Sequence, residues 1–387
     1  MNVELRVYDQ DLAPLGIVDE VTSLLWTPTY WDEGTVGDIK LLVPMTQNNK
    51  NLLVKGNIIV KHDGTPDFTD TAGTWRRATQ IKYRHITKDV EGAEQIEIQG
   101  CFLKKWLSKR IILNQIVTTA TEQEKINRIV KENHGSQAAV KRQLPRFVFL
   151  AQDDLGGTST DYANEYFIDA GKEIYNRALA GKLGYDILVN ENTKQYGWYL
   201  YKGKDLTSTN NDGNTPSIFS RDFDNVNEQE YTESEEGYKN VVYVTGAADD
   251  SEVTPVVEVD QGGSGLDRDE VYKDCSSIAR KYTENEVEII IPPAEYNKLL
   301  AAAGESTLEE YGETVSFTAT INISSNLKYK QDFDLGDRVT CIEKNWGIRI
   351  DVRITAVCET YQNGTKEIEA TLGDSLPTLI QQIRKVR

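Results

Sequence analysis

The residue types that most often carry out catalysis are scarce in this chain and form no recognised constellation. Among 387 residues there are three histidines, His62, His85 and His134. The first two fall in strand-like segments and the third at a predicted helix end, so we expect structural or surface roles for all three. The segment around Ser264 resembles a nucleophile elbow, but Leu266 replaces its last glycine and no histidine follows. The H-E-x-x-H zinc motif does not occur.

The cysteines form no metal-binding or redox motif. Cys101, Cys275, Cys341 and Cys358 lie far apart, and no two form a C-x-x-C pair. Cysteine-protease chemistry would need a cysteine to meet a histidine across the fold, which no motif indicates. Cys341 and Cys358 fall in strand-like segments, where a reduced, buried thiol is expected.

Carboxylates are abundant, but their spacing does not match a calcium loop. The segments 212–214 and 267–270 each match part of such a loop, yet neither is closed by a glutamate at the twelfth position. We expect a turn at the first and a helix start at the second. Residues 222–236 contain seven acidic and no basic side chains, which favours a solvated face or linker over a metal site. The acidic residues of this segment are Asp222, Asp224, Glu228, Glu230, Glu233, Glu235 and Glu236.

These patterns predict no catalytic, cofactor-binding or metal-binding residues. One alternative stays open, because a pair of carboxylates that cleaves glycosides could be identified only from distances. The 61 acidic and 43 basic residues give a net charge of −18, which argues against sequence-independent nucleic-acid binding. An acidic balance suits a protein through which DNA passes without adhering, and a lumen lined with Lys and Arg would contradict that idea.

The start and the hydropathy of the chain predict no membrane insertion. No run of about 18 apolar residues occurs. Residues 1–6 lack the charged-then-apolar layout of a signal peptide. We therefore expect synthesis in the cytoplasm without a signal peptide.

Residues 1–112 have the pattern of short strands separated by turns. Apolar and polar residues alternate in 81–86 and 95–100, and Asp63-Gly64 is a turn signal. Many short strands at this spacing predict a first β-barrel. Five aromatic residues of this region are Trp26, Tyr30, Trp31, Trp75 and Trp106. We expect them to pack in the core, with a protein interface or sugar stacking on Trp26 or Trp31 as alternatives.

Residues 113–222 change to a helical period and predict an α+β insertion with two helices and a hairpin. Residues 121–124 form a capping box ahead of apolar residues at helical spacing. A second helix is predicted over 163–180, although Gly171 inside it weakens the pattern. The hairpin is predicted over 185–201, and an exposed loop over 204–216.

Residues 223–265 and 313–375 predict a second, discontinuous β-barrel. It is interrupted by a helix-strand-helix insertion at 266–312 and followed by a short basic tail at 376–387. The barrel strands are expected at 240–245, 315–323, 338–342, 348–357 and 366–372, the last two joined through Asn363-Gly364. In the insertion we expect a helix at 267–282, a strand at 287–291 and helical stretches at 294–303 and 308–311, with Pro293 in a first turn.

The order of several segments resembles the Gp37-like family of siphovirus tail proteins, which is related to phage baseplate-hub and tail-associated proteins. The similar stretches are Trp31–Pro44, Phe219–Asn225, Tyr238–Val244, Leu335–Thr340, Gly347–Ile348, Arg353–Thr355 and Leu372–Leu379. Each is a generic strand-and-turn motif, and their order and spacing carry the resemblance.

The resemblance implies an α+β, mainly β, baseplate-hub-like fold of two β-barrels with two α+β insertions. Three copies would present six similar, separately closed barrels and so match a sixfold tail tube to a threefold tip. The chain would be a non-enzymatic, homotrimeric hub at the tail tip of a bacteriophage or prophage virion. It would contact the tail tube or distal tail protein and a tip, fibre or tape-measure protein, while genomic DNA passes without specific binding. The alternatives are a tail-tip cell-wall hydrolase or endopeptidase and a carbohydrate-binding host-recognition module.

Overall fold

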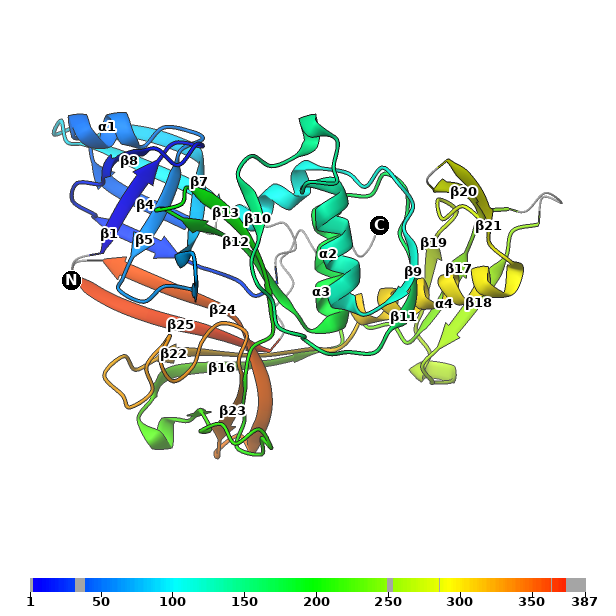
Figure 1. The fold of residues 1–387 in the computed structure, drawn as a ribbon. Helices are drawn as coiled ribbons and strands as arrows, with labels where there is room; N and C mark the ends of the chain where they lie inside the picture. The colour runs from blue at the N-terminus through cyan, green and yellow to red at the C-terminus, as the bar shows by residue number, and fades with distance from the viewer. Residues whose placement is uncertain (1–2, 32–38, 249–252, 285, 363, 374–387) are drawn as a thin grey trace.

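The first β region is an antiparallel sheet built from the N-terminal strands of the chain. The computed structural model describes residues 3–31, 39–248, 253–284, 286–362 and 364–373 (Figure 1). The strands of this region are β1 (Glu4–Tyr8), β2 (Pro14–Ile17), β3 (Ser23–Trp26), β4 (Ile39–Pro44), β5 (Ile58–His62), β6 (Phe68–Asp70), β7 (Gly73–Lys88) and β8 (Glu94–Phe102). Their pairing follows the order β2-β1-β5-β7-β8-β4-β3, with β6 paired to β7. The strand-rich pattern predicted for this region is confirmed.

Two short helical segments complete the first β region. They are α1 (Gln47–Leu52) and the 3-10 helix η1 (Leu103–Lys109). Neither was predicted, because both are shorter than the window in which a helical period is visible. The start of α1 is stabilised by Thr46, whose side chain accepts a hydrogen bond from the backbone N–H of Asn49.

The second β region is assembled from strands on both sides of a long interruption. These strands are β14 (Asp205–Leu206), β15 (Ile218–Phe219), β16 (Val226–Ser234), β22 (Thr314–Ile321), β23 (Arg338–Glu343), β24 (Ile348–Gln362) and β25 (Thr365–Gly373). The antiparallel order is β16-β22-β25-β24-β23, and β14 and β15 run parallel to β23. The strands predicted after residue 313 are confirmed, and Gln362 lies opposite Thr365 at the predicted hairpin. Asn363 and the tail at 376–387 lie outside the described residues.

The acidic segment 222–236 is mostly a strand. After the 3-10 helix η3 (Arg221–Phe223), β16 pairs along its whole length with β22. The linker interpretation is therefore wrong, because the backbone of residues 226–234 is hydrogen-bonded into the sheet. The interpretation as a solvated face is confirmed, since Glu228, Glu230 and Glu233 are exposed.

The two β regions share hydrogen bonds, so the expectation that they form separate sheets is wrong. β3 pairs with β24, with Trp26 opposite Glu359 and Ser23 opposite Gln362. The physical reason is the length of β24, which pairs with β23 at its start and reaches both β25 and β3 further on. An unpaired edge on β3 would leave backbone donors and acceptors without partners. The α+β, mainly β class is confirmed.

The first insertion packs two helices beside a hairpin (Figure 1). Its elements are β9 (Val117–Ala120), α2 (Glu122–Asn133), the 3-10 helix η2 (Val140–Arg142), β10 (Phe147–Phe149), β11 (Thr160–Ala163), α3 (Ala170–Gly181), β12 (Gly184–Asn190) and β13 (Gln195–Tyr201). The capping box of α2 and the β12–β13 hairpin are confirmed. The second helix begins at Ala170, seven residues later than predicted, because 160–163 pair with β9.

Glycine inside α3 has a packing reason. A Cβ atom on Gly171 would lie 2.2 Å from Oγ of Ser108 and 2.7 Å from its backbone nitrogen. The helix therefore approaches η1 more closely than any other residue would allow, which offsets the cost of glycine in a helix.

The second insertion, drawn at the right of Figure 1, is a small sheet covered by one helix. Its elements are β17 (Val241–Thr245), β18 (Val256–Asp260), the 3-10 helix η4 (Gly265–Asp267), β19 (Glu270–Asp274), β20 (Lys281–Glu284), β21 (Val287–Ile290) and α4 (Pro293–Glu310). The strand at 287–291 and the position of Pro293 in the first turn are confirmed. The two helical stretches predicted after it form one continuous helix.

Two predictions for this insertion are wrong. The helix expected at 267–282 is absent, because β19 pairs in parallel with β17 and β20 with β21. The strand expected at 240–245 exists but does not join the second β region. It lies between β18 and β19 beneath α4, where Val242 and Val244 are buried. No helix in the described part of the chain combines the length and apolar character of a membrane span.

Candidate functional site

Buried and partly buried charges gather where the first β region, the first insertion and the second β region meet. We call this group the charged junction; it consists of Lys61, Asp63, Asp67, Arg77, Asp186, Lys330, Glu359 and Lys366. Arg77 on β7 is 6% exposed. Its Nε donates to Asp186 on β12 at 2.7 Å, and its Nη1 donates to Asp67 at 2.8 Å. Arg77 thereby ties the hairpin of the first insertion to the first β region.

Lysines extend the charged junction into the second β region. Lys330, in the loop between β22 and β23, lies 3.1 Å from Asp67. Lys61 on β5 lies 2.9 Å from Asp63 and 2.5 Å from Glu359 on β24. Lys366 on β25 contacts the second oxygen of Glu359 at 2.5 Å. Cations and carboxylates alternate through the junction, so each buried charge has opposite charges beside it.

Two carboxylates of the junction, Glu359 and Asp67, remain ionised in spite of their burial. Burial alone would raise the pKa of Glu359, but Lys61 and Lys366 lower the pKa to about 2. Burial also acts to raise the pKa of Asp67, and Lys330 together with Arg77 holds that pKa well below its usual range. Paired and hydrogen-bonded charges of this kind fix the relative orientation of the elements that carry them, because moving two partners apart would leave a buried charge without compensation.

Tyr30 is wedged into the same region and is fully buried. Its hydroxyl donates to the carbonyl of Lys182 at 3.0 Å. A Cβ atom on Gly184 would lie 2.1 Å from the Tyr30 ring, and one on Gly336 would lie 2.4 Å from it. The ring therefore fills a slot between the first insertion and the second β region that only two glycines leave open.

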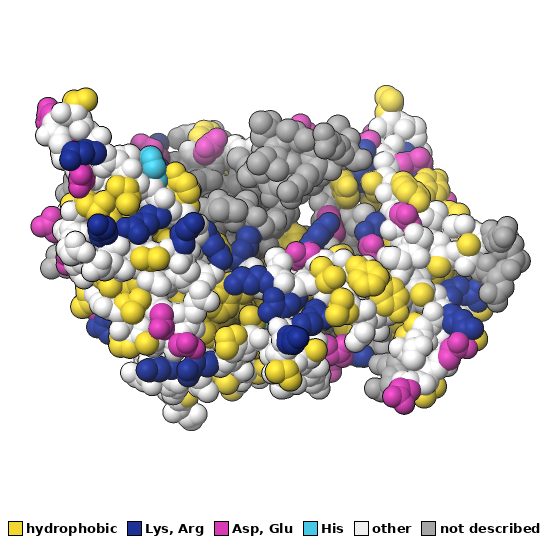
Figure 2. All heavy atoms as spheres, turned by 90° about the horizontal axis from the view of Figure 1, so that it is seen from above, with side chains coloured by type: hydrophobic (Ala, Val, Ile, Leu, Met, Phe, Trp, Pro, Cys, Tyr) yellow, Lys and Arg dark blue, Asp and Glu magenta, His cyan; other side chains and the backbone are white. Residues whose placement is uncertain are grey.

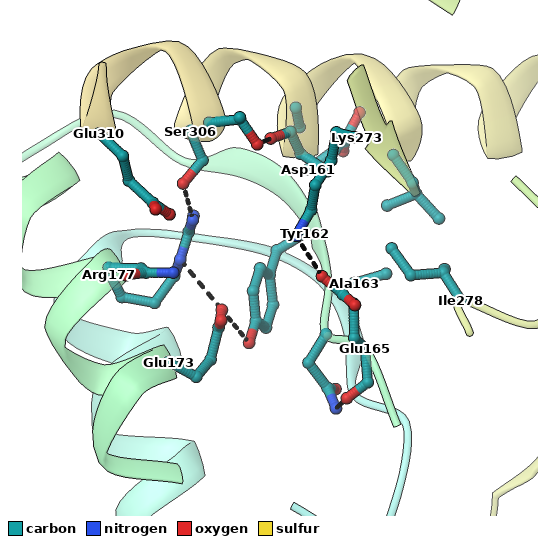
Figure 3. A pocket seen from close by; sticks show the side chains of 16 residues that line it. Asp161, Tyr162, Ala163, Glu165, Glu173, Arg177, Lys273, Ile278, Ser306 and Glu310 are labelled. Atoms are coloured by element: carbon teal, nitrogen blue, oxygen red, sulfur yellow. Dashed lines mark hydrogen bonds and ion pairs between the residues drawn. The ribbon is translucent and has the colours of Figure 1, made fainter. Parts of the chain in front are cut away.

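A second polar cluster joins the two insertions (Figure 3). Tyr162 on β11 donates to Glu173 on α3 at 2.9 Å, and Nε of Arg177 lies 3.2 Å from the same carboxylate. Arg177 also donates to the hydroxyl of Ser306 on α4. Burial raises the pKa of Glu173, and Arg177 opposes that rise. The cavity among these side chains measures about 40 Å³. That is room for water molecules rather than for a sugar or peptide.

A wider groove lies along the exposed face of α2, with a volume of about 920 Å³. Amide and charged side chains line it, among them Asn127, Lys131 and Gln137. Two of its carboxylates are already engaged. Glu132 pairs with Arg128 at 2.7 Å, and Glu124 accepts the backbone N–H of Thr121. The groove therefore offers polar contacts rather than free acid–base groups from these two residues.

The histidines considered above sit on separate elements. His62 on β5 lies 3.0 Å from Glu191. His85 is exposed on β7. His134 is buried at the end of α2, where its Nε2 is 2.9 Å from the carbonyl of Leu107, and burial lowers its pKa to about 4. Ser264 is exposed ahead of η4.

The cysteines are free thiols. Cys101, Cys275 and Cys341 are buried, whereas Cys358 is half-buried, so the expectation of a buried thiol is confirmed for Cys341 and not for Cys358. Burial raises the pKa of Cys275 to about 12, which keeps this thiol protonated and unreactive.

The two partial calcium loops have different outcomes. At 212–214 the chain bends, with Gly213 at a φ of 75°, and does not form a hydrogen-bonded turn. Residues 267–270 lead from η4 into β19, so the expected helix start is wrong. Within the described residues, no group of three or more His, Cys, Asp or Glu side chains is placed to hold a metal ion.

The early aromatic residues pack as the core interpretation predicts. Trp26, Tyr30, Trp75 and Trp106 are buried, and Trp31 is half-buried with its Nε1 donating to the carbonyl of Leu183 at 2.9 Å. A buried Trp26 ring has no face free for a sugar. The sequence interpretation missed Trp346, which is 51% exposed in the turn between β23 and β24. It also missed Arg77, which lies in a segment rich in polar and basic residues and gives no sequence signal of burial.

Comparisons with known proteins agree with this architecture. Residues 4–374 match the family described as Siphovirus ReqiPepy6 Gp37-like protein. The tail protein from Neisseria meningitidis MC58 superposes with a TM-score of 0.54 at 12% identity over 97% of both chains. The 43 kDa tail protein of prophage MuSo2 from Shewanella oneidensis gives 0.54 at 10% identity, over 95% of this chain and 98% of that one.

Prophage tail protein gp18 from Listeria monocytogenes EGD-e gives a TM-score of 0.53 at 13% identity, over 99% of this chain and 98% of that one. A search of curated proteins found no match. At such identities the solved structures establish a shared fold alone, whereas the family match spans nearly the whole chain. The chain therefore belongs to the Siphovirus ReqiPepy6 Gp37-like protein family and has the fold of phage tail proteins.

Proposed function

We propose that this chain is a non-enzymatic structural hub at the tip of a bacteriophage or prophage tail, where three copies form a ring around the DNA channel. The observation that carries the proposal is the fold shared with phage tail proteins along nearly the full length of both chains. Each copy has two β regions, so three copies present six. That count would match a sixfold tube to a threefold tip.

The charged junction supports the same role. A symmetry adaptor must keep a fixed angle between its two β regions, because a variable angle would prevent the ring from closing. The β3–β24 pairing and the ion pairs Lys61–Glu359 and Lys330–Asp67 hold that angle. In this proposal geometry, rather than a reactive group, supplies the activity.

The proposed neighbours are the tail tube or distal tail protein on one side and a tip, fibre or tape-measure protein on the other. Genomic DNA passes through the ring without specific binding. The proposed location is the tail tip of the virion, which antibody labelling of intact particles would locate in electron micrographs. Labelling along the tail shaft or on the capsid would contradict it.

The ring is tested by measuring the mass of the purified chain in solution. We expect three chain masses in sedimentation velocity and threefold averages in electron micrographs. A stable monomer that releases soluble fragments from purified cell walls would instead support the hydrolase alternative. Binding to isolated host wall glycans by a monomer would support the carbohydrate-binding alternative.

A further inference from the structure

A line of basic side chains crosses one face of this acidic protein. We call it the basic belt; it consists of Lys50, Lys82, Arg84, Lys109, Arg110 and Arg142. Arg84 on β7 donates to the carbonyl of Lys50 on α1 at 2.9 Å, and Arg110 donates to the carbonyl of Arg142 at 2.9 Å. Figure 2 shows Lys and Arg side chains gathered on the face that lies over the first β region and the first insertion.

The charges of the basic belt are not compensated by carboxylates in the part of the chain that the structure describes. None of its six members forms an ion pair with a carboxylate among the described residues. Partial burial and the nearby charges of Lys82 and Arg110 lower the pKa of Lys109 to about 8. Nε of Arg84 is buried without a hydrogen-bond partner. These cations repel one another, and an anionic surface placed against the belt would reduce that repulsion.

The same chain carries a matching anionic surface on β16. Glu228 and Glu230 are exposed and two positions apart, so they point to the same side of the strand at a separation of about 7 Å. Lys82 and Arg84 are close together on β7, but Lys82 is the unpaired residue where the ladder with β8 shifts register between Ile81 and Tyr83, so strand alternation does not place it on the same side as Arg84. Among the described strands β16 pairs only with β22, which leaves its other edge open to a partner.

The two surfaces cannot meet within one molecule. β16 lies on the lower side of the molecule as drawn in Figure 1, whereas α1, whose Lys50 carbonyl accepts a hydrogen bond from Arg84, lies at the top. Complementary patches on different faces produce head-to-tail contacts, which close into a ring when the rotation between copies allows it.

We propose that the basic belt of one copy binds the acidic strand β16 of the next copy. This contact rests on the proposed trimer and names the surfaces that form it. The side chains at its centre are Lys82 and Arg84 on one copy and Glu228 and Glu230 on the other. Charge complementarity sets the orientation and speed of association. It also disfavours contacts of one basic belt with another basic belt, or of one β16 with another β16.

Paired charge reversals test the contact. Lys82→Glu with Arg84→Glu, and separately Glu228→Lys with Glu230→Lys, should each weaken trimer formation at least tenfold in sedimentation equilibrium. The combined fourfold variant should recover, because every contact again joins opposite charges. The matched control reverses the exposed pair Lys281 and Glu288 on the second insertion, and it should leave the trimer unchanged.

The outcomes separate this contact from the proposed function. A wild-type trimer that neither reversal weakens, or a fourfold variant that stays as weak as the two reversals, overturns the contact and leaves the ring standing. A wild-type chain that is monomeric at every concentration contradicts the ring and this contact with it. Circular dichroism checks folding, and Gln at the same four positions replaces any reversal that does not fold.

A duplex DNA of about two helical turns is the competing occupant of the belt. Fluorescence anisotropy at physiological salt should detect no binding by the wild-type trimer. Binding that Lys82→Glu with Arg84→Glu abolishes while the trimer persists would assign the belt to DNA and overturn the proposed contact. Rising salt should weaken wild-type association, since exposed charges are screened over about 8 Å at 0.15 M.

Discussion

Lys61 on β5 and Glu359 on β24 form an ion pair of 2.5 Å, although 298 positions separate them in the sequence. Their side chains are 3% and 1% exposed. The pair lies beside the β3–β24 ladder, so it connects the two β regions at the same place as the backbone hydrogen bonds between β3 and β24. Charges this deeply buried contribute to stability only as long as both partners are present.

We predict that Glu359→Gln lowers the free energy of unfolding by about 3 kcal/mol, because it leaves Lys61 buried with one carboxylate fewer. Urea unfolding at pH 7 measures this loss. The pKa of Glu359 is about 2 in the folded chain. This is below the unfolded value of about 4.3. The stabilisation is therefore present above the unfolded pKa and is lost as the pH falls toward 2, so the difference between variant and wild type should shrink at pH 3.

The control for this prediction is Glu4→Gln, which removes the exposed pair between Glu4 and Arg6. An exposed pair contributes less than about 1 kcal/mol, so this variant should unfold nearly like the wild type. Equal losses for Glu359→Gln and Glu4→Gln would show that the charged junction does not hold the two β regions together.

We predict that Gly184→Ala lowers the free energy of unfolding by about 1–3 kcal/mol, because its new methyl group overlaps the Tyr30 ring. Tyr30→Phe keeps the ring and loses the hydrogen bonding of the hydroxyl to the carbonyls of Lys182 and Tyr201, at a cost of about 1 kcal/mol. Thermal unfolding of both variants measures these effects. Gly312→Ala is the matched control, since its Cβ would meet nothing closer than 3.8 Å. A neutral Gly184→Ala would contradict the tight slot.

Features set by neighbouring residues were predictable from the sequence. The capping box at Thr121, the hairpin at 185–201 and the first-turn position of Pro293 each depend on residues within a few positions. Long strands after residue 313 were predictable for the same reason, since their alternation is local. The family was also identified correctly, because the order of generic segments is more specific than any one segment.

Features set by distant partners were not predictable. The segment around Val271 is acidic at its start and was expected to be helical, but parallel pairing with β17 makes it a strand. The pairing of β3 with β24 joins positions more than 300 apart, and alternation does not specify which edge meets which. Arg77 lies in a segment rich in polar and basic residues, so its burial was not visible in the sequence, and no pattern identifies Asp186 as its partner among so many carboxylates.

We predict that Arg177→Met destabilises the docking of the second insertion onto the first. The substitution leaves Glu173 buried without its cation and removes the hydrogen bond to Ser306 on α4. The expected loss of unfolding free energy is about 3 kcal/mol, with faster hydrogen exchange along α4. Arg128→Met, at a partly exposed pair on α2, should leave α4 exchange unchanged. Unaltered exchange in Arg177→Met would contradict the docking role of this cluster.

We predict that His134 makes the protein less stable as the pH falls from about 6.5 to about 4. Burial lowers the folded pKa of His134 to about 4. The unfolded pKa is about 6.5. Between these values the unfolded chain binds the proton and the folded chain does not, so unfolding is favoured by up to about 3 kcal/mol. Urea unfolding of wild type and His134→Gln at pH 7, 5.5 and 4 isolates this contribution.

The comparison with His134→Gln is necessary because another buried group acts in the opposite direction. Burial raises the pKa of Asp337 to about 6, so the folded chain holds that proton first and gains stability as the pH falls from 6. The total slope therefore mixes two signs, whereas the difference between wild type and His134→Gln contains the histidine alone. His85→Gln, at an exposed histidine, should keep the wild-type slope. A pH-independent difference between wild type and His134→Gln would mean that His134 titrates alike in the folded and unfolded chains.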